Sequence, residues 1–217
     1  MIIIIYLEYE IKTHLLRSAK QFSRRPIVQI QAISEHKILV SLSDNVVSIH
    51  NLDSFTLITT LAKTKGATHF SLDVFRIRTL TGELQCTVRL CVVVKYQLML
   101  FYWKNGYFHE LQPNIKLNDI ARSVVWYGQY LYAGLRNQYI QVTIEKGSVK
   151  ELFPIVTEPL ILPLTTNSES VGILGTGTNN SGTIKNNNSA LALCRDKQTF
   201  IFDQEAKPLL DFPVRLV

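Results

Sequence analysis

Short runs of hydrophobic residues, rich in β-branched and aromatic types, recur along the chain between turn-forming residues. Residues 27–33 alternate apolar and polar side chains, as expected for a strand with one buried face. Within residues 88–111 three such runs follow one another, and Asn105-Gly106 before the third run favours a tight hairpin turn. No amphipathic helix of convincing length interrupts the runs. The pattern therefore predicts an all-β protein.

The expected strands form groups of four. They are residues 27–33, 37–42, 46–50 and 56–61; 68–75, 88–94, 98–103 and 107–111; 120–126, 129–135, 138–144 and 149–153; and 159–164, 190–194, 197–202 and 208–212. The residues that end the second strand of each group, Leu42, Val94, Leu135 and Cys194, are 52, 41 and 59 positions apart. Allowing for one longer loop and one low-complexity tract, the repeat is about 40 residues. This repeat predicts β-propeller blades; a β-sandwich or barrel would also give short strands, but without the four-strand period.

We therefore expect residues 1–217 to form a partial β-propeller of about four blades, each with four antiparallel strands. Residues 1–12 should give an orphan strand of a first blade, and the polar residues 14–25 a connector with at most a short helical turn. Residues 165–188, rich in Thr, Asn, Ser and Gly, should be a low-complexity insertion, and residues 189–217 a partial further blade. The first strand has no turn before it, which suggests a fragment or an incomplete gene model.

Composition narrows the class of protein only a little. The net charge is +6, and the basic residues are scattered. This charge fits a solvated basic surface, and it leaves open a phosphate-rich partner or an anionic membrane surface. The three cysteines are an odd number, and two of them lie in apolar runs, which favours a reducing, intracellular compartment. The amino-terminal apolar run lacks a basic leader, and no run reaches the ~18 apolar residues of a membrane span.

No motif indicates catalysis. The five histidines do not have metal-ligand spacing, and there is no phosphate-binding loop, nucleophile elbow or Cys-x-x-Cys. We therefore expect no enzyme, no metal and no cofactor. The candidate partner-binding residues are four basic residues of inter-strand loops, which could equally be solvated loop charges: Arg24, Arg25, Lys63 and Lys65. Five aromatic residues should pack between blades: Tyr102, Trp103, Tyr107, Phe108 and Trp126.

Several segments carry a family resemblance. They are residues 22–30 leading into 37–42, 58–67, 101–104 with 108–112, and 146–154. Together they resemble the citron homology (CNH) propeller domain of the Vam/Vps subunit family of the HOPS tethering complex, with the TGF-β-receptor-associated protein as a near relative. The resemblance covers residues 22–163. Its most specific part is the Lys-Gly-Ser-x-Lys-Glu-Leu-Phe-Pro run of residues 146–154, followed by the Lys-x-Lys-Gly-Ala run of residues 63–67.

The resemblance implies a seven-bladed CNH propeller that an α-solenoid follows in the complete protein. It implies a non-enzymatic interaction module that supports Rab-dependent fusion of late endosomes with lysosomes or vacuoles, and vesicle-mediated protein transport. The implied partners are other HOPS-type tethering subunits and a late-endosomal Rab GTPase, with no nucleic acid and no small-molecule substrate. The implied location is the cytoplasm, peripherally on the late-endosomal or lysosomal membrane.

The chain departs from the family pattern in three ways: it starts within the first blade, carries an Asn-rich insertion, and stops before the later blades. Three other functions stay open on the sequence alone. The domain could be the CNH regulatory domain of a protein kinase or another small-GTPase-binding scaffold. A hydrolase propeller would need histidines and carboxylates that converge on the central channel, and a nucleic-acid binder has only the net charge in its favour.

Overall fold

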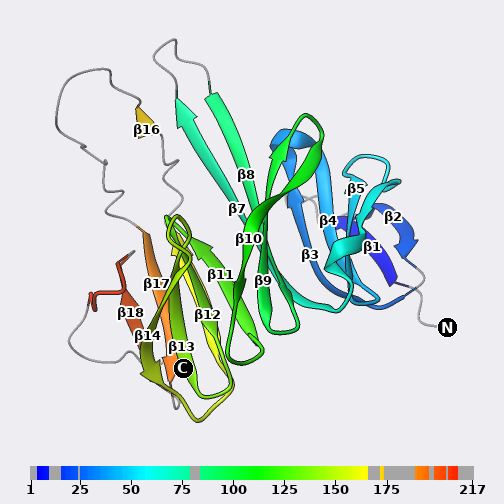
Figure 1. The fold of residues 1–217 in the computed structure, drawn as a ribbon. Helices are drawn as coiled ribbons and strands as arrows, with labels where there is room; N and C mark the ends of the chain where they lie inside the picture. The colour runs from blue at the N-terminus through cyan, green and yellow to red at the C-terminus, as the bar shows by residue number, and fades with distance from the viewer. Residues whose placement is uncertain are drawn as a thin grey trace. The chain divides into compact units, whose positions relative to one another are not determined.

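The computed structural model describes residues 4–9, 16–23, 25–78, 84–165, 172–173, 189–195, 198–203 and 205–209. Within these ranges the chain forms β-strands and two short 3-10 helices, η1 (Ser34–His36) and η2 (Ala62–Thr64), and no α-helix (Figure 1). The all-β prediction is confirmed. The chain divides into two compact units, residues 1–70 and residues 71–217.

The strands form five sheets. The first contains β1 (Ile4–Tyr9) and β2 (Leu16–Ser23). The second contains β3 (Ile27–Ile33), β4 (Ile38–Ser43), β5 (Val46–Asn51) and β6 (Leu57–Leu61). The third contains β7 (Ala67–Arg78), β8 (Leu84–Val94), β9 (Gln97–Lys104), β10 (Tyr107–Lys116) and β16 (Gly172–Ile173). The fourth contains β11 (Ser123–Tyr127), β12 (Tyr130–Gly134), β13 (Gln138–Thr143) and β14 (Ser148–Pro154). The fifth contains β15 (Leu160–Thr165), β17 (Ser189–Arg195) and β18 (Gln198–Phe202).

The predicted four-strand meanders are present, with some differences at their edges. In the sheets β3–β6 and β11–β14 each strand pairs antiparallel with the next one along the chain. The third sheet has an additional strand, β16, which pairs parallel with the end of β7. In the last sheet, Pro208 forms a single bridge to Phe202, and the rest of the expected strand 208–212 lies largely outside the described residues.

Two predictions are wrong. Residues 14–25 were expected to be a connector, but they contain β2, which pairs antiparallel with β1. Pairing with a neighbouring strand overrides the weak strand preference of a polar, basic segment. Tyr107 was expected in the core between blades, but its side chain is 60% exposed, because it begins the outer strand β10 beside the turn.

Tight turns join consecutive strands of the sheets. At Asn105-Gly106 both residues have positive φ, 52° and 84°, which confirms the predicted hairpin turn. Asp44 and Asn45 adopt φ values of 54° and 58° between β4 and β5. Short polar residues accept this left-handed backbone at low cost.

One backbone contact recurs in three sheets. In each of these sheets a short loop joins the second strand to the third, and the fourth strand is followed by a connector to the next sheet. The carbonyl of the loop's last residue accepts a hydrogen bond from a backbone N–H of that connector. The pairs are Gly66 N–H to Asn45 O, Leu117 N–H to Tyr96 O and Ile155 N–H to Asn137 O, each at 2.8 Å. The contact ties each outgoing connector to the central hairpin of its own sheet, so that these loops lie at the same end of the sheet.

The second unit has two hydrophobic cores, one on each face of the sheet β11–β14. Its aliphatic face, with Leu131 and Val142, packs against β8 and β9 through residues such as Cys91 and Leu98. Its other face carries a row of tyrosines and packs against β15, β17 and β18; the buried members of that core are Tyr127, Tyr132, Tyr139, Ile155, Ile161, Leu191, Leu193 and Phe202. The two faces follow the period-2 alternation of side chains along each strand.

The Tyr139 hydroxyl links the last two sheets. It donates to the carbonyl of Cys194 at 2.6 Å, lies 3.1 Å from the carbonyl of Leu160, and accepts the Leu160 N–H at 2.9 Å. Leu160 and Cys194 are partners in the β15–β17 pair, so one side chain fixes both strands. Burial raises the pKa of Tyr139 to about 12.

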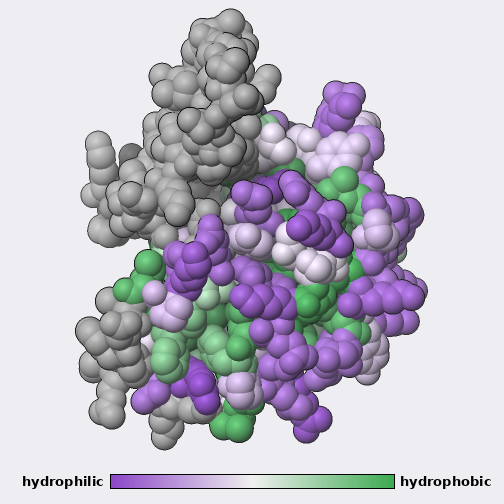
Figure 2. Space-filling view, turned by 60° about the vertical axis from the view of Figure 1, so that its left-hand side comes forward, coloured by the Kyte–Doolittle hydropathy of each residue, from purple (hydrophilic) through white to green (hydrophobic). Residues whose placement is uncertain are grey.

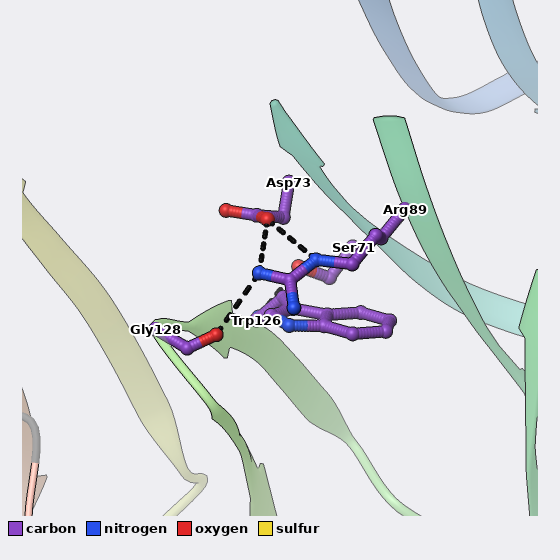
Figure 3. Close-up of polar contacts among 5 residues, drawn as sticks. All are labelled: Ser71, Asp73, Arg89, Trp126 and Gly128. Carbon is purple, nitrogen blue, oxygen red and sulfur yellow. Dashed lines mark hydrogen bonds and ion pairs between the residues drawn. The ribbon is translucent and has the colours of Figure 1, made fainter. Parts of the chain in front are cut away.

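A second polar link joins the sheet β7–β10 to the sheet β11–β14 (Figure 3). Ser71 Oγ accepts the backbone N–H of Trp126 at 2.8 Å. Arg89 donates to Asp73 Oδ2 from Nε at 2.9 Å and from Nη2 at 2.5 Å, and Nη2 also donates to the Gly128 carbonyl at 3.0 Å. The guanidinium lies 4.6 Å from the centre of the Trp126 ring. Burial raises the pKa of Asp73, and the nearby Arg89 charge opposes that rise.

In the first unit, the β3–β6 sheet buries one aliphatic face that includes Val40, Val47 and Ile49. His50 is 6% exposed on the other face, and its Nε2 lies 3.0 Å from Ser41 Oγ. Burial lowers the pKa of His50, against a smaller opposing effect of a backbone hydrogen bond with Phe55, and burial also lowers the pKa of His69.

We predict that Tyr139→Phe lowers the free energy of unfolding by about 1–3 kcal/mol, because the Leu160 N–H and the Cys194 carbonyl would both lose a part-buried partner. Urea unfolding followed by circular dichroism measures this change. Tyr107→Phe makes the same chemical change at an exposed side chain and should alter stability by less than about 0.5 kcal/mol. Equal stabilities of the two variants would show that the hydroxyl does not support the last sheet.

The two histidines with lowered pKa predict a pH dependence of stability. As the pH falls below about 6.5, the unfolded chain takes up protons on His50 and His69 before the folded chain does. Stability should therefore fall with falling pH, by at most about 1.4 kcal/mol per pH unit for each histidine. Urea midpoints at several pH values between about 7.5 and 5.5 measure this slope.

The double variant His50→Gln/His69→Gln should have a flatter profile than the unmodified chain over the same pH range. The prediction is wrong if the double variant and the unmodified chain lose stability in parallel.

Candidate partner-binding surface

The described members of the predicted basic set lie at one end of the sheet β3–β6. Arg25 lies just before β3, and the first residue of β3 pairs with the last residue of β4. Lys63 and Lys65 lie just after the end of β6. Because successive strands are antiparallel, these three positions share the end of the sheet that carries the Asp44-Asn45 turn. Arg24 lies outside the described residues.

Thr64 holds the lysine-bearing loop in place. Its side chain is fully buried; its hydroxyl donates to the Leu61 carbonyl at 2.7 Å and accepts the Val47 N–H at 3.0 Å. The loop is a single 3-10 turn, closed by the Lys65 N–H and the Ala62 carbonyl at 3.3 Å. Because the residue between them is directed inward, Lys63 and Lys65 are both exposed.

Asn45 supports the same loop from the neighbouring turn. Its carbonyl accepts the N–H groups of Gly66 and Ala67 at 2.8 and 2.9 Å, and its side-chain amide donates to the Ala67 carbonyl at 3.2 Å. On the other side of the turn, Ser43 Oγ donates to the Arg25 carbonyl at 3.5 Å. The three candidate cations are therefore carried on backbone that side-chain and main-chain hydrogen bonds fix.

Charge at this end of the sheet is mainly positive. Arg25, Lys63 and Lys65 are exposed, and the adjacent turn contributes one exposed acid, Asp44. At the opposite end of the same sheet, Lys37 forms an ion pair with Asp53 at 3.4 Å, and both side chains are largely exposed. The arrangement can attract an acidic partner surface, and an ion pair at such an exposed site contributes mainly to the rate and specificity of association.

The sequence indicated the lysines but not the residues that place them. Residues 43–45 only separate two of the expected strands, and Thr64 was not singled out. A threonine between two lysines in a predicted loop gives little signal, because its burial depends on a strand 17 residues earlier. The Lys-x-Lys-Gly-Ala run does contain most of the loop, from Lys63 to the first residue of β7.

Residues that could support catalysis are not grouped in the described part of the chain. Three or more metal-ligating side chains do not come together there. Cys91 is fully buried within β8, and its surroundings raise the pKa of its thiol well above the usual range. Burial also raises the pKa of the Tyr132 hydroxyl, which accepts a hydrogen bond from Gln141 at 2.7 Å. In the described ranges we find no helix long and apolar enough to cross a membrane.

The sequence is similar to vacuolar sorting proteins from animals and plants. It is 41% identical to the human Vam6/Vps39-like protein over 159 residues, which are 72% of this chain and 17% of the relative. It is 30% identical to the Vacuolar protein sorting-associated protein 39 homolog of Drosophila melanogaster over 61% of the chain and 16% of the relative. For Vacuolar sorting protein 39 of Arabidopsis thaliana the identity is 26%, over 66% of the chain and 13% of the relative. The chain thus spans less than a fifth of the length of each of these relatives.

Solved structures with the same arrangement of strands include the N-terminal domain of Nup159, with a TM-score of 0.60 and 18% identity over 97% of this chain and 59% of that one. The β-propeller domain of Cps50 (Swd1) from Myceliophteria thermophila gives a TM-score of 0.51 and 12% identity over 88% of this chain and 58% of that one. At these identities the likeness shows the fold alone. It confirms the prediction of a partial β-propeller.

The family model described as "CNH domain" matches residues 6–208, almost the whole chain. The match includes the strands of both units and the basic loop end. It agrees with the resemblance carried by residues 22–163, and it extends that resemblance in both directions. On this match, and on a fold that is part of a β-propeller, the chain belongs to the CNH-domain family.

Proposed function

We propose that this chain is a non-enzymatic interaction module of a HOPS-type tethering complex. The supporting observation is the 41% identity to the human Vam6/Vps39-like protein, which extends over 72% of the chain. In this role the module contacts other tethering subunits and acts peripherally on late-endosomal or lysosomal membranes, from the cytoplasmic side. It supports fusion of these compartments and vesicle-mediated protein transport.

The β-propeller is the structural scaffold of this module. Residues 26–164 supply the blades that best match the family, residues 1–12 an orphan strand of a first blade, and residues 189–217 part of a further one. Residues 165–188 are an insertion between strands of the last blade. Blades pack through their faces, so the loops at their ends can vary without loss of the core, and partner contacts belong on those loops.

The basic end of the sheet β3–β6 contacts a late-endosomal Rab GTPase in its GTP-bound state. Three observations support this assignment: the cations of Arg25, Lys63 and Lys65 lie at one end of the sheet, their loops are fixed by Thr64 and Asn45, and the Lys-x-Lys-Gly-Ala run is among the segments that resemble the family. Exposed cations on a rigid loop favour rapid encounter with an acidic surface and restrict its orientation.

We predict that the variant Arg25→Glu/Lys63→Glu/Lys65→Glu binds the GTP-loaded Rab at least about tenfold more weakly than the unmodified chain, because three attractive charges become repulsive. Pull-down and biolayer interferometry with the Rab loaded with GTP or GDP measure the effect. The unmodified chain should bind the GTP form in preference to the GDP form.

Lys37→Glu is the matched control, since it reverses one charge of the same sheet at the opposite end. It should keep binding within about twofold of the unmodified chain. Equal binding of both nucleotide states, or no binding of either, would count against a direct Rab contact. If the triple variant and the Lys37 control lose Rab binding equally, the contact does not lie at the basic end.

A further inference from the structure

A hollow of about 600 Å³ opens in the second unit beside the outer strands β10 and β14. One wall is a bulge in β10: residues 112–114 lie between Leu111, which pairs with Leu100, and Ile115, which pairs with Leu98. The facing wall is the turn at residues 144–147, which joins β13 to β14. A large bulge on an edge strand redirects side chains and interrupts pairing, and such bulges often border binding sites.

The lining combines an apolar floor with a cationic rim. Leu100 and Ile115 are almost completely buried beneath the hollow, and Ile144 adds a further aliphatic side chain. The exposed Lys116 and Lys146 stand on opposite walls, one at the end of β10 and the other in the β13–β14 turn. Glu145 is the single acidic residue of the lining, and the carboxylate of Glu110 contacts the lining residues Gln112 and Asn114, so positive charge is local to Lys116 and Lys146. The volume is within the range of about 300–1,000 Å³ of ligand pockets in proteins.

The bulge also contains a buried hydrogen-bond acceptor that has no partner among the described residues. Glu110 Oε1 accepts hydrogen bonds from the side-chain amides of Gln112 and Asn114. This arrangement orients the Asn114 amide and leaves its Oδ1 atom buried, with no hydrogen-bond partner among the described residues. A buried carbonyl oxygen without a partner costs about 1–3 kcal/mol. Because Asn114 Oδ1 is closed to solvent in the free chain, a ligand N–H reaches it only when the side chains of the bulge move apart, and the hydrogen bond then recovers that loss.

We infer that this hollow binds an extended acidic segment of a partner protein. The segment places one large apolar side chain on the floor formed by Leu100 and Ile115. Its main-chain N–H donates to Asn114 Oδ1, and carboxylates on either side of the apolar residue meet Lys116 and Lys146. This site is separate in the fold from the basic end of β3–β6, and it stands whether or not that end binds a Rab.

The chemistry of the lining favours a peptide over a lipid headgroup or a free phosphate. A phosphate would use the lysines but would leave the aliphatic floor and the Asn114 acceptor unused, since neither interacts favourably with an anion. An extended peptide supplies the three required groups together: an N–H donor, an apolar side chain and flanking acids. It also fits beside β10, the first strand in the order of its sheet, where the backbone is open to pairing.

The test uses four pools of fluorescein-labelled nine-residue peptides, in which the central residue is Leu or Ser, the flanking residues are Asp/Glu or Lys/Arg, and the other positions are randomised. Fluorescence polarisation with the 217-residue chain measures binding. The acidic pool with central Leu should bind at least about tenfold more tightly than the other three pools. Lys116→Glu/Lys146→Glu should weaken this binding at least about tenfold, and Asn114→Leu should weaken it several-fold.

Lys104→Glu/Arg136→Glu is the matched control, because it reverses two exposed charges of the same unit at the ends of β10 and β13 that lie away from the hollow. It should stay within about twofold of the unmodified chain. Circular dichroism confirms that each variant is folded. The inference is overturned if no pool binds below about 1 mM, if the acidic pool binds regardless of its central residue, or if the control loses as much binding as the hollow variant. Binding of phosphatidylserine vesicles that depends on Lys116 and Lys146, without peptide binding, would overturn it in favour of a lipid surface.

Discussion

The need to cover both faces of each sheet determines how the second unit is built. The sheet β11–β14 is apolar on both faces, because Leu131 and Val142 point one way and Tyr132 and Tyr139 the other. Such a sheet is stable in water only between two others, and the strands before it and after it supply that cover. The last sheet, formed by β15, β17 and β18, is covered on one face by the sheet β11–β14. Its opposite face carries leucines of β15 that are 37–47% exposed. Figure 2, with this side turned forward, shows hydrophobic residues at the surface.

Polar contacts then determine how one sheet is aligned on the next, because hydrophobic burial alone does not fix this alignment. Apolar packing is nearly indifferent to small sliding of one sheet over another, whereas a hydrogen bond is not. Tyr139 reaches two backbone partners in the next sheet, and Arg89 reaches a backbone carbonyl from the previous one. The recurring tie between connector and hairpin has the same effect within a sheet. It also explains why loops of different sequence are all held at one end, which separates the residues that stabilise a blade from those that are free to contact partners.

The sequence was sufficient for features that depend on neighbouring residues. The Asn105-Gly106 turn is local and is present in the structure. Residues 27–33 form the predicted strand, but the prediction of its buried face is wrong, because Val28 and Ile30 are exposed. The sequence was insufficient where contacts with residues far away along the chain determine the local structure. β2 is a strand because β1 lies beside it, and the strand β16 pairs with a segment about 95 positions earlier. The candidate surface divides in the same way: the lysines were found from their charge, but Thr64 and the bulge in β10 depend on contacts that spacing does not encode.

The two proposed binding surfaces use charge differently, and the difference follows from their geometry. At the end of β3–β6 the cations stand on exposed loops, where solvent and salt screen them, so that they act on encounter and orientation. At the hollow beside β10, Lys116 and Lys146 flank an apolar floor and an acceptor without a partner, so that charge is combined with burial and a directional bond. Apolar burial and a recovered hydrogen bond are weakly affected by salt. A single chain can therefore bind one partner through a contact that forms quickly and that salt weakens strongly. It can bind another partner through a contact that forms more slowly and resists salt. The two sites do not use the same residues.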